Sequence, residues 1–343
     1  MNKKPLRCKS KSQLPPFLPV KKNDSDDQEW QMIYNTIVKN SKNFDYLNKN
    51  ETDIYEGSIN CKDEKKDIPN EGWALITGAS RGIGRAIAVE LARYKVPIIL
   101  VARSHSKLLE LSKTLEKCYD IPTMIIVSDL TKNDAAEQLW DMIVKESNKK
   151  GIPFQIDVFI HNAGIGDTKD LVDMDTNKIQ DIITVNTISG SKLCQIFGEQ
   201  MKQRRRGRIV LISSVTALVP GVPTAGIYAA TKAFQRSLAV SIGKEMEPFG
   251  VGVTCVCPGA VHDTHFAVGS NMKDASIWKV PFGKLTSEAV ARSTIRGMIR
   301  GHPETIVGWF NAINFKFVVL LLPERMVTFV CTFAWSPQPF LKK

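Results

Sequence analysis

A tyrosine and a lysine, Tyr228 and Lys232, stand four residues apart in a segment of helical texture. Residues at i and i+4 of a helix lie on one face, so the phenol and the ammonium group come close together. A tyrosine has a reference pKa of about 10, and a nearby cation favours its ionised form. The pair is therefore typical of general acid/base chemistry at an oxygen atom. The same spacing occurs by chance in many helices, so its meaning depends on the rest of the chain.

A glycine-rich turn, Thr77-Gly-Ala-Ser-Arg-Gly-Ile-Gly84, lies between an expected strand and an expected helix. Gly78, Gly82 and Gly84 allow a tight turn and a close approach of the backbone to a ligand. A pyrophosphate can then sit at the helix N-terminus, where free N–H groups and the helix dipole favour anions. A strand before the turn and a helix after it are the context that a dinucleotide site requires. The alternative is a glycine-rich connector that binds no ligand.

The end of the second expected strand, Val101-Ala102-Arg103-Ser104, carries no acidic side chain. An acid at this place binds the ribose hydroxyls of NAD and would repel a 2′-phosphate. Arg103, with Arg81 in the glycine turn, could instead hold that phosphate by charge-assisted hydrogen bonds. We therefore expect NADP(H) as the cofactor, the alternative for each arginine being a solvated surface charge.

The pattern of apolar residues after residue 70 predicts the strands and helices that must position these residues. Short apolar runs alternate with longer helical patterns, which is the signature of βαβ units and a parallel sheet. The near-continuous hydrophobicity of the runs suits strands that are covered on both faces. We expect strands over 73–77, 97–101, 123–127, 156–160, 208–212 and 251–256, and helices over 83–95, 106–118, 133–145, 177–203, 227–247 and 287–299. The predicted fold class is α/β, a Rossmann-type doubly wound parallel sheet in a single domain with helices on both faces.

Composition divides the chain into three parts. Residues 1–70 are rich in Lys, Asn, Asp and Ser, and we expect a basic, mostly disordered arm with one short helix. Residues 71–303 should form the Rossmann domain, and residues 304–343 an apolar extension on the substrate side. The net charge is +11, but seven basic residues and no acid lie in the first 22 positions. The remaining +4 is an ordinary solvated surface, so nucleic acid is not the expected partner.

The seven cysteines form no C-x-x-C pair and no metal-ligand spacing with the five histidines. We expect free thiols in a reducing compartment and no metal site. Pro15, Pro16 and Pro19 interrupt the only candidate signal peptide, and they favour a disordered arm over an organellar transit peptide. The expected location is the cytoplasm, or the cytoplasmic face of an internal membrane such as the endoplasmic reticulum, and secretion is not expected.

Four motifs occur in a consistent order and spacing: the T-G-x-x-x-G-x-G turn, Asn162-Ala163-Gly164 after the fourth strand, Ser213-Ser214 after the fifth, and Tyr228-x-x-x-Lys232. By these motifs the chain resembles the single-domain short-chain dehydrogenases/reductases, over roughly residues 72–258 and more loosely beyond. In texture it is similar to the 17β-hydroxysteroid dehydrogenase and 3-oxoacyl-CoA reductase members. The resemblance implies an NADP(H)-dependent oxidoreductase that interconverts a ketone and a secondary alcohol.

The resemblance also implies a role for each matching residue. Tyr228 would donate the proton, Lys232 would lower the tyrosine pKa and hold the nicotinamide ribose, and Ser214 would orient the substrate carbonyl. Asn186 would hold a water molecule that links Lys232 to solvent. Asp129 would contact adenine, Asn162 to Gly164 would pass beneath the adenosine half, and Pro258-Gly259 would line the nicotinamide. The expected cofactor-binding set is Gly78, Ser80, Arg81, Gly82, Ile83, Gly84, Arg103, Asp129, Leu130, Asn162, Ala163, Gly164, Tyr228, Lys232, Pro258, Gly259, Val261 and Thr264.

The chain departs from the family pattern in two loops. One residue more than usual separates Ser214 from Tyr228, which an extra loop residue within 219–225 would explain. Ser213 and Thr216 are the alternatives to Ser214. The stretch from Pro258 to Thr264 also carries one residue more than usual, so the contact of Thr264 with the carboxamide rests on a shifted alignment. His161 replaces the usual asparagine before Asn162, and we expect a structural role for it.

Residues 307–335 are unusually apolar and aromatic, but Lys316 and Arg325 interrupt every uncharged run before it reaches the roughly 20 residues of a membrane span. The segment could form a lid over a lipophilic pocket, lie in a membrane interface, pack at a subunit contact such as that of a homodimer, or be a plain buried helix. By analogy with the resembling branches, we expect a fatty acyl, sphingoid or steroid-like carbonyl substrate, and a polar carbonyl compound is the alternative.

Two other functions share this fold. A non-catalytic NADP(H)-binding sensor or scaffold would keep the nucleotide site, but such proteins commonly lose a catalytic residue, and Asn186, Ser214, Tyr228 and Lys232 are all present. A nucleotide-sugar epimerase is disfavoured because that branch spaces its glycine turn differently. We therefore expect an enzyme.

Overall fold

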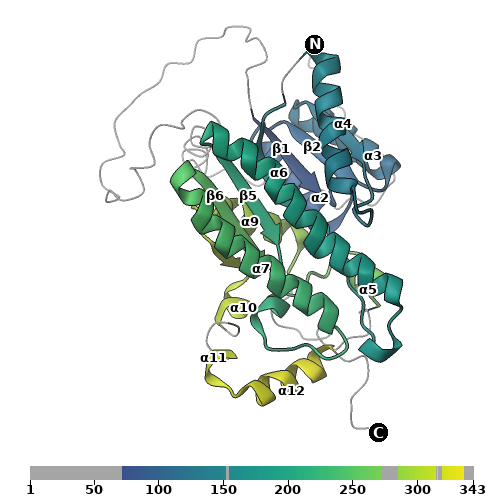
Figure 1. The fold of residues 1–343 in the computed structure, drawn as a ribbon, viewed down its shortest axis with the longest axis vertical. Coiled ribbons are helices and arrows are strands. Elements are labelled where there is room, and N and C mark those ends of the chain that lie inside the picture. The colour runs from purple at the N-terminus through teal and green to yellow at the C-terminus, as the bar shows by residue number, and fades with distance from the viewer. Residues whose placement is uncertain (1–71, 152–153, 272–284, 314, 316–318, 336–343) are drawn as a thin grey trace, which may run out of the picture.

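The computed structural model of the chain describes residues 72–151, 154–271, 285–313, 315 and 319–335. These residues form one parallel sheet with helices on both faces (Figure 1). The arm expected over residues 1–70 lies outside the described residues. The C-terminal helices lie together at one end of the molecule, beyond the carboxyl ends of the central strands.

The sheet has seven strands in the order β3-β2-β1-β4-β5-β6-β7, and every neighbouring pair is parallel. This confirms the doubly wound fold. The order reverses between β1 and β4, and a crevice at such a switch point is where ligands bind in open α/β sheets. The strands are β1 (Trp73–Thr77), β2 (Ile98–Ala102), β3 (Thr123–Val127), β4 (Ile156–His161), β5 (Gly207–Ile212), β6 (Val251–Cys257) and β7 (Glu304–Ile306).

Only β7 was not expected from the sequence. It has three residues and pairs with β6 through Cys255↔Glu304, Val256↔Thr305 and Cys257↔Ile306. A run this short shows neither the alternation nor the apolar length by which a strand is recognised. It nevertheless places the start of the C-terminal segment beside the end of β6.

The helices that flank the sheet are α2 (Gly82–Arg93), α3 (His105–Tyr119), α4 (Ala135–Lys150), α5 (Thr176–Ile183), α6 (Ser189–Arg204), α7 (Gly226–Met246) and α9 (Ser287–Ile299). Shorter helices are α8 (Phe266–Gly269), α10 (Trp309–Ile313) and α11 (Val319–Leu321), and α12 (Glu324–Trp335) follows them. The 3-10 turns are η3 (Leu171–Asp173), η5 (Val215–Leu218) and η6 (Glu247–Phe249). The single helix expected over 177–203 is instead α5 and α6 joined by a π-helical turn, η4 (Thr184–Ile188).

Alternating strand residues divide the core into two layers. Ala74 and Ile76 of β1 face the layer formed with α2, α3 and α9, whereas Leu75 faces the layer formed with α4, α6 and α7. Successive side chains of a strand point to opposite faces, so strands covered on both faces must be apolar throughout. All five residues of β1 and of β2 are accordingly buried.

Within the described residues, no helix combines the length and the apolar content that crossing a bilayer requires.

Candidate active site

A cavity of about 710 Å³ opens at the carboxyl ends of the strands. Its walls come from the turns after β1, β2, β3, β4, β5 and β6, from α7, and from the segment after β7. Every residue of the expected catalytic and cofactor-binding sets lines it, except Gly84 and Asn186, which are buried behind the wall. The fold thus brings residues that are distant in sequence into one site.

The glycine turn and the end of β4 are held together by hydrogen bonds. Nδ2 of Asn162 donates to the carbonyl oxygens of Thr77 (3.0 Å) and Gly78 (3.3 Å), and Oγ1 of Thr77 accepts from the backbone N–H of Asn162 and of Ala163. Gly78 has a φ of +67°, which favours glycine. A Cβ at Gly84 would lie 2.5 Å from the oxygen of Gly78. The first turn of α2 therefore depends on glycine at both positions.

Arg81 and Arg103 are exposed at the rim of the same cavity, near the turns after β1 and β2. No ion pair joins either guanidinium to a carboxylate of the described residues. Asp129 lines the cavity beyond β3, where its Oδ1 accepts a hydrogen bond from the backbone N–H of Thr131 at 3.2 Å. The two guanidinium groups can thus meet an anionic ligand without first breaking an ion pair within this part of the chain.

The two serines after β5 have different partners. Oγ of Ser213 donates to the backbone oxygen of Lys232 at 2.7 Å. This hydrogen bond occupies the hydroxyl and fixes α7 against β5. Oγ of Ser214 is a hydrogen-bond partner of Tyr228 and accepts from the backbone N–H of Thr216. Of the alternatives that the sequence left open, Ser214 is the one whose hydroxyl meets the tyrosine.

Burial controls the ionisation of the tyrosine and the lysine. Burial raises the pKa of Tyr228 to about 12, although the hydrogen bond from Ser214 opposes this rise. Burial likewise lowers the pKa of Lys232 to about 8. Nζ of Lys232 lies 5.7 Å from the centre of the Tyr228 ring. Burial is the largest influence on the pKa of the phenol, and the role expected of Lys232 in lowering the pKa of Tyr228 stays a prediction.

The ammonium group of Lys232 has two oxygen partners inside the protein. Nζ donates to the carbonyl oxygen of Ile212 at 2.8 Å and to Oε1 of Gln235 at 2.9 Å. Gln235 is buried, and its Nε2 has no partner among the described residues. Gln235 is not among the residues predicted from the sequence. Its position three residues after Lys232, on the same face of α7, is the signal that could have identified it.

Asn186 lies in the π-helical turn and is completely buried. Its Oδ1 accepts from the backbone N–H of Ile165 at 3.0 Å, and its Nδ2 donates to the oxygen of Ile165 and to Oγ1 of Thr231, both at 2.9 Å. The amide therefore ties the loop after β4 to α7. The water relay expected at this residue stays a prediction.

His161, at the end of β4, is buried, with Nδ1 3.3 Å from Oγ1 of Thr77. Burial and the nearby charge of Lys232 lower the pKa of His161 to about 3, so the ring is neutral at physiological pH. A Cβ at Gly190 would lie 2.7 Å from Nε2 of His161. His161 therefore packs between β1 and α6, which matches the structural role expected for it.

The loop after β6 forms the wall beside the glycine turn. Pro258, Gly259, Val261 and Thr264 all line the cavity. A Cβ at Gly82 would lie 3.1 Å from Cγ2 of Thr264, so a larger residue at Gly82 would meet this loop. Thr264 thus lines the cavity beside the glycine turn, and its contact with a carboxamide stays a prediction.

The remaining wall is apolar and comes from the C-terminal segment. It is formed by Phe315, Val319, Leu322, Val327, Val330, Cys331 and Ala334. Phe266 of α8 adds an aromatic ring 5.4 Å from the ring of Tyr228. The segment expected to be a lid, a membrane contact, an interface or a plain helix therefore contributes directly to the cavity.

Known proteins resemble this chain over the same region. Residues 72–274 match the family model described as short chain dehydrogenase. The very-long-chain 3-oxoacyl-CoA reductase of Mus musculus is 30% identical over 230 residues, which are 65% of this chain and 67% of that protein. The enzyme of the same name from Aspergillus clavatus is 30% identical over 192 residues, 55% of this chain and 53% of that protein. The chain thus spans about half the length of the first relatives it matches.

Solved structures agree with the fold. A short-chain dehydrogenase from Sphingobium yanoikuyae in complex with NADPH has a TM-score of 0.64 and 26% identity, covering 72% of this chain and 92% of that one. An alcohol dehydrogenase from Thermococcus sibiricus complexed with 5-hydroxy-NADP has a TM-score of 0.57 and 26% identity, covering 69% and 95%. With the matched family model extending across more than half of its length, the chain belongs to the short chain dehydrogenase family.

Proposed function

We propose that this protein is an NADP(H)-dependent oxidoreductase that interconverts a ketone and a secondary alcohol. The observation that carries the proposal is the convergence of Ser214, Tyr228 and Lys232 on a cavity whose other end is the glycine turn. The hydroxyl contact between Ser214 and Tyr228 gives a carbonyl oxygen two adjacent donors.

The residues of the cavity fit this cofactor. The backbone at Gly78 and Gly84 leaves no room for a Cβ, as a close phosphate-binding turn requires, and the N-terminus of α2 adds a favourable dipole. Arg81 and Arg103 would bind a 2′-phosphate, and Asp129 with Leu130 would contact adenine. Ser80, Ile83, Asn162, Ala163 and Gly164 would line the adenosine and pyrophosphate half. Pro258, Gly259, Val261 and Thr264 would line the nicotinamide. The similar protein from Sphingobium yanoikuyae was solved with NADPH.

When bound, NADPH supplies the hydride to the carbonyl carbon. Tyr228 gives its proton to the carbonyl oxygen, for which a phenol with a pKa of about 12 is in the correct protonated form at neutral pH. The phenolate that results is stabilised by the hydroxyl of Ser214 and by the charge of Lys232, which would also hold the nicotinamide ribose. Asn186 would complete the path by which Lys232 exchanges a proton with solvent. In the direction of alcohol oxidation these roles are reversed.

We propose a lipophilic substrate, of fatty acyl, sphingoid or steroid-like character. The wall beside Tyr228 consists of Phe266 and the apolar side chains of the C-terminal segment. Similar proteins from Mus musculus and Homo sapiens are named very-long-chain 3-oxoacyl-CoA reductases. A small polar carbonyl compound would leave this wall exposed to water, which disfavours its binding.

We also propose that the outer face of α11 and α12 contacts a membrane surface from the cytoplasmic side, including that of the endoplasmic reticulum. Leu321, Met326 and Phe329 are exposed there and do not line the cavity, with Leu321 80% accessible. Exposed apolar side chains on a helix favour an interface over bulk water. Flotation with liposomes should recover the wild-type protein and lose the Phe329→Glu variant, and equal recovery would contradict the contact.

A homodimer is proposed because Phe234 and Val240 of α7, Ile183 of α5 and Ile188 of the π-helical turn are apolar and exposed. Light scattering during size-exclusion chromatography tests this proposal through the molar mass. A mass of about one chain at every concentration would contradict it.

The central test combines cofactor binding with turnover. NADPH fluorescence should report binding to wild type and to Tyr228→Phe alike, whereas oxidation of NADPH in the presence of steroid, acyl-CoA and aliphatic ketones should be lost in the variant. The Arg103→Asp variant should shift preference from NADPH towards NADH. If wild type binds NADPH but reduces no carbonyl in the panel, the alternative of a non-catalytic NADP(H)-binding sensor or scaffold is favoured.

A further inference from the structure

The loop after β6 is joined to the residues just before α9 by an isolated β-bridge. Val261 pairs with Leu285 in a parallel bridge, the backbone N–H of Leu285 donates to the oxygen of Ala260 at 3.2 Å, and that of His262 donates to the oxygen of Leu285 at 3.0 Å. Val261 and Leu285 are both buried. The wall of the cavity that contains Val261 is therefore attached to the residues that precede α9.

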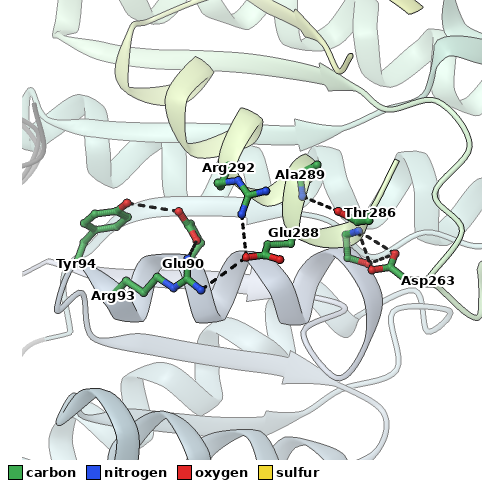
Figure 2. A network of polar contacts seen from close by, with 9 residues as sticks. Glu90, Arg93, Tyr94, Asp263, Thr286, Glu288, Ala289 and Arg292 are labelled. Atoms are coloured by element: carbon green, nitrogen blue, oxygen red, sulfur yellow. Dashed lines mark hydrogen bonds and ion pairs between the residues drawn. The ribbon is translucent and has the colours of Figure 1, made fainter. Parts of the chain in front are cut away.

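Asp263 extends this contact to the helix itself. Its carboxylate accepts from the backbone N–H of Ser287 at 2.8 and 3.0 Å, and Oδ1 also accepts from Oγ of Ser287 at 2.7 Å. The first turn of a helix presents unpaired N–H groups and a positive dipole, both of which favour a carboxylate. The helix also has a cap of its own, since Oγ1 of Thr286 accepts from the backbone N–H of Ala289 at 3.1 Å. Figure 2 shows Asp263 and Thr286 together at the start of α9.

The position of α9 is fixed on the helix that carries the glycine turn. Arg93 of α2 pairs with Glu90 at 3.0 Å and with Glu288 of α9 at 3.7 Å, and Arg292 holds Glu288 at 2.8 Å (Figure 2). Below these ion pairs the two helices share one apolar core. The helix that begins at Gly82 and the helix that Asp263 caps are thus packed as one unit.

Thr264, the residue after Asp263, lies beside the glycine turn. Its Cγ2 would be 3.1 Å from a Cβ at Gly82, and its Oγ1 donates to the oxygen of Val261 at 3.1 Å. Contacts therefore lead from the glycine turn through α2 and α9 to Asp263, and the next residue, Thr264, lies beside the glycine turn.

We propose that Asp263 is a positioning residue that holds the loop after β6 at a fixed distance from the glycine turn, so that the cofactor pocket is formed before the cofactor binds. This inference rests on the proposed binding of NADP(H). Anchoring a loop in advance removes an ordering cost from ligand binding. Asp263 itself does not line the cavity, so its effect on binding passes through its neighbours.

The test compares two caps of the same helix. Asp263→Ala and Thr286→Ala each remove one capping side chain from α9, and both should lower the thermal unfolding temperature. Of the two capping side chains, only that of Asp263 comes from the loop that forms the cavity wall. Asp263→Ala should therefore raise the dissociation constant for NADPH about tenfold, while Thr286→Ala should change it by less than about twofold. Ser287→Ala is a milder variant that removes only the 2.7 Å bond and should raise the constant about threefold.

Fluorescence titration of NADPH gives these constants without depending on turnover. Equal constants for Asp263→Ala and Thr286→Ala would overturn the inference and leave the proposed function standing. Should Asp263→Ala fold too poorly for titration, an unchanged constant for Ser287→Ala would overturn it instead. A wild-type protein that binds neither NADPH nor NADH would overturn the proposed function and this inference with it.

Discussion

Lys232 holds a positive charge where the protein offers little hydration. The residue is 4% exposed, and burial lowers its pKa from 10.5 to about 8. Each pKa unit corresponds to about 1.4 kcal/mol of free energy. The charged lysine therefore lowers the stability of the folded protein by about 3 kcal/mol at pH 7, relative to a lysine that stays hydrated.

The free-energy cost of the charged lysine falls as the pH rises. Below about pH 8 the folded and unfolded states both hold the proton, so the cost is present in full. Between about pH 8 and 10.5 the folded state releases the proton and the unfolded state keeps it. The unfolded state then binds more protons, so this group makes stability rise with pH in that window. Above pH 10.5 the cost has disappeared.

Lys232→Met removes the charge and keeps most of the volume. It also leaves the oxygen of Ile212 and Oε1 of Gln235 without their donor, which costs about 1–3 kcal/mol at every pH. At pH 7 the stability gained by removing the buried charge and the stability lost with these two hydrogen bonds nearly cancel. From pH 7 to pH 10 the variant should lose about 2–3 kcal/mol relative to wild type, because only wild type benefits from releasing the proton.

Urea unfolding of both proteins at half-unit steps from pH 7 to 10 measures this difference. Other groups that titrate in this range are common to both proteins and cancel. A difference that stays constant within about 0.5 kcal/mol across the range would refute the claim that burial of this charge costs stability. In that case the pKa of Lys232 would be near its hydrated value.

Three further predictions follow from the packing and the site. Gly190→Ala should lower the free energy of unfolding by about 1–2 kcal/mol, because the cost of overpacking against His161 exceeds the gain in helix propensity. Urea unfolding measures this change. Gly226→Ala is the control, because nothing lies within 4 Å of its new Cβ. Arg206→Met should destabilise by about 3 kcal/mol in the same assay, because it removes the nearest partner of the buried Asp157. Ser214→Ala should reduce kcat with an unchanged dissociation constant for NADPH, and a matching loss of NADPH affinity would contradict its assignment to the carbonyl.

The sheet and its ligand turn could be predicted from sequence because their signals are local. Strands such as β1 and β2 are buried on both faces and must be apolar at every position. Gly78 and Gly84 identify the turn because the close backbone approaches there exclude any side chain. Ser214, Tyr228 and Lys232 meet in one cavity because they follow from motifs tied to those elements.

What could not be predicted depends on contacts between distant parts of the chain. The break of 177–203 into two helices follows from Asn186, whose amide binds Ile165 and Thr231 from within the π-helical turn. The high pKa of Tyr228 reflects how completely the fold buries the phenol, which no spacing reveals. The apolar side chains of Phe315, Val319 and α12 are likewise assigned to the cavity only by the way the C-terminal segment packs.

The loop between Ser214 and Tyr228 shows why an extra residue need not disturb the pair. Thr224 adopts a φ of +67°, and its carbonyl oxygen accepts a hydrogen bond from the backbone N–H of Lys169, which fits a loop that absorbs one residue locally. The relation of β5 to α7 is set elsewhere, by the buried 2.7 Å hydrogen bond from Ser213 to the oxygen of Lys232. Shortening the loop by one residue should therefore leave the contact of Ser214 with Tyr228 and the turnover nearly unchanged. Ser213→Ala, which removes that bond but keeps the loop length, should reduce turnover, and the opposite ranking of the two variants would show that loop length positions the pair.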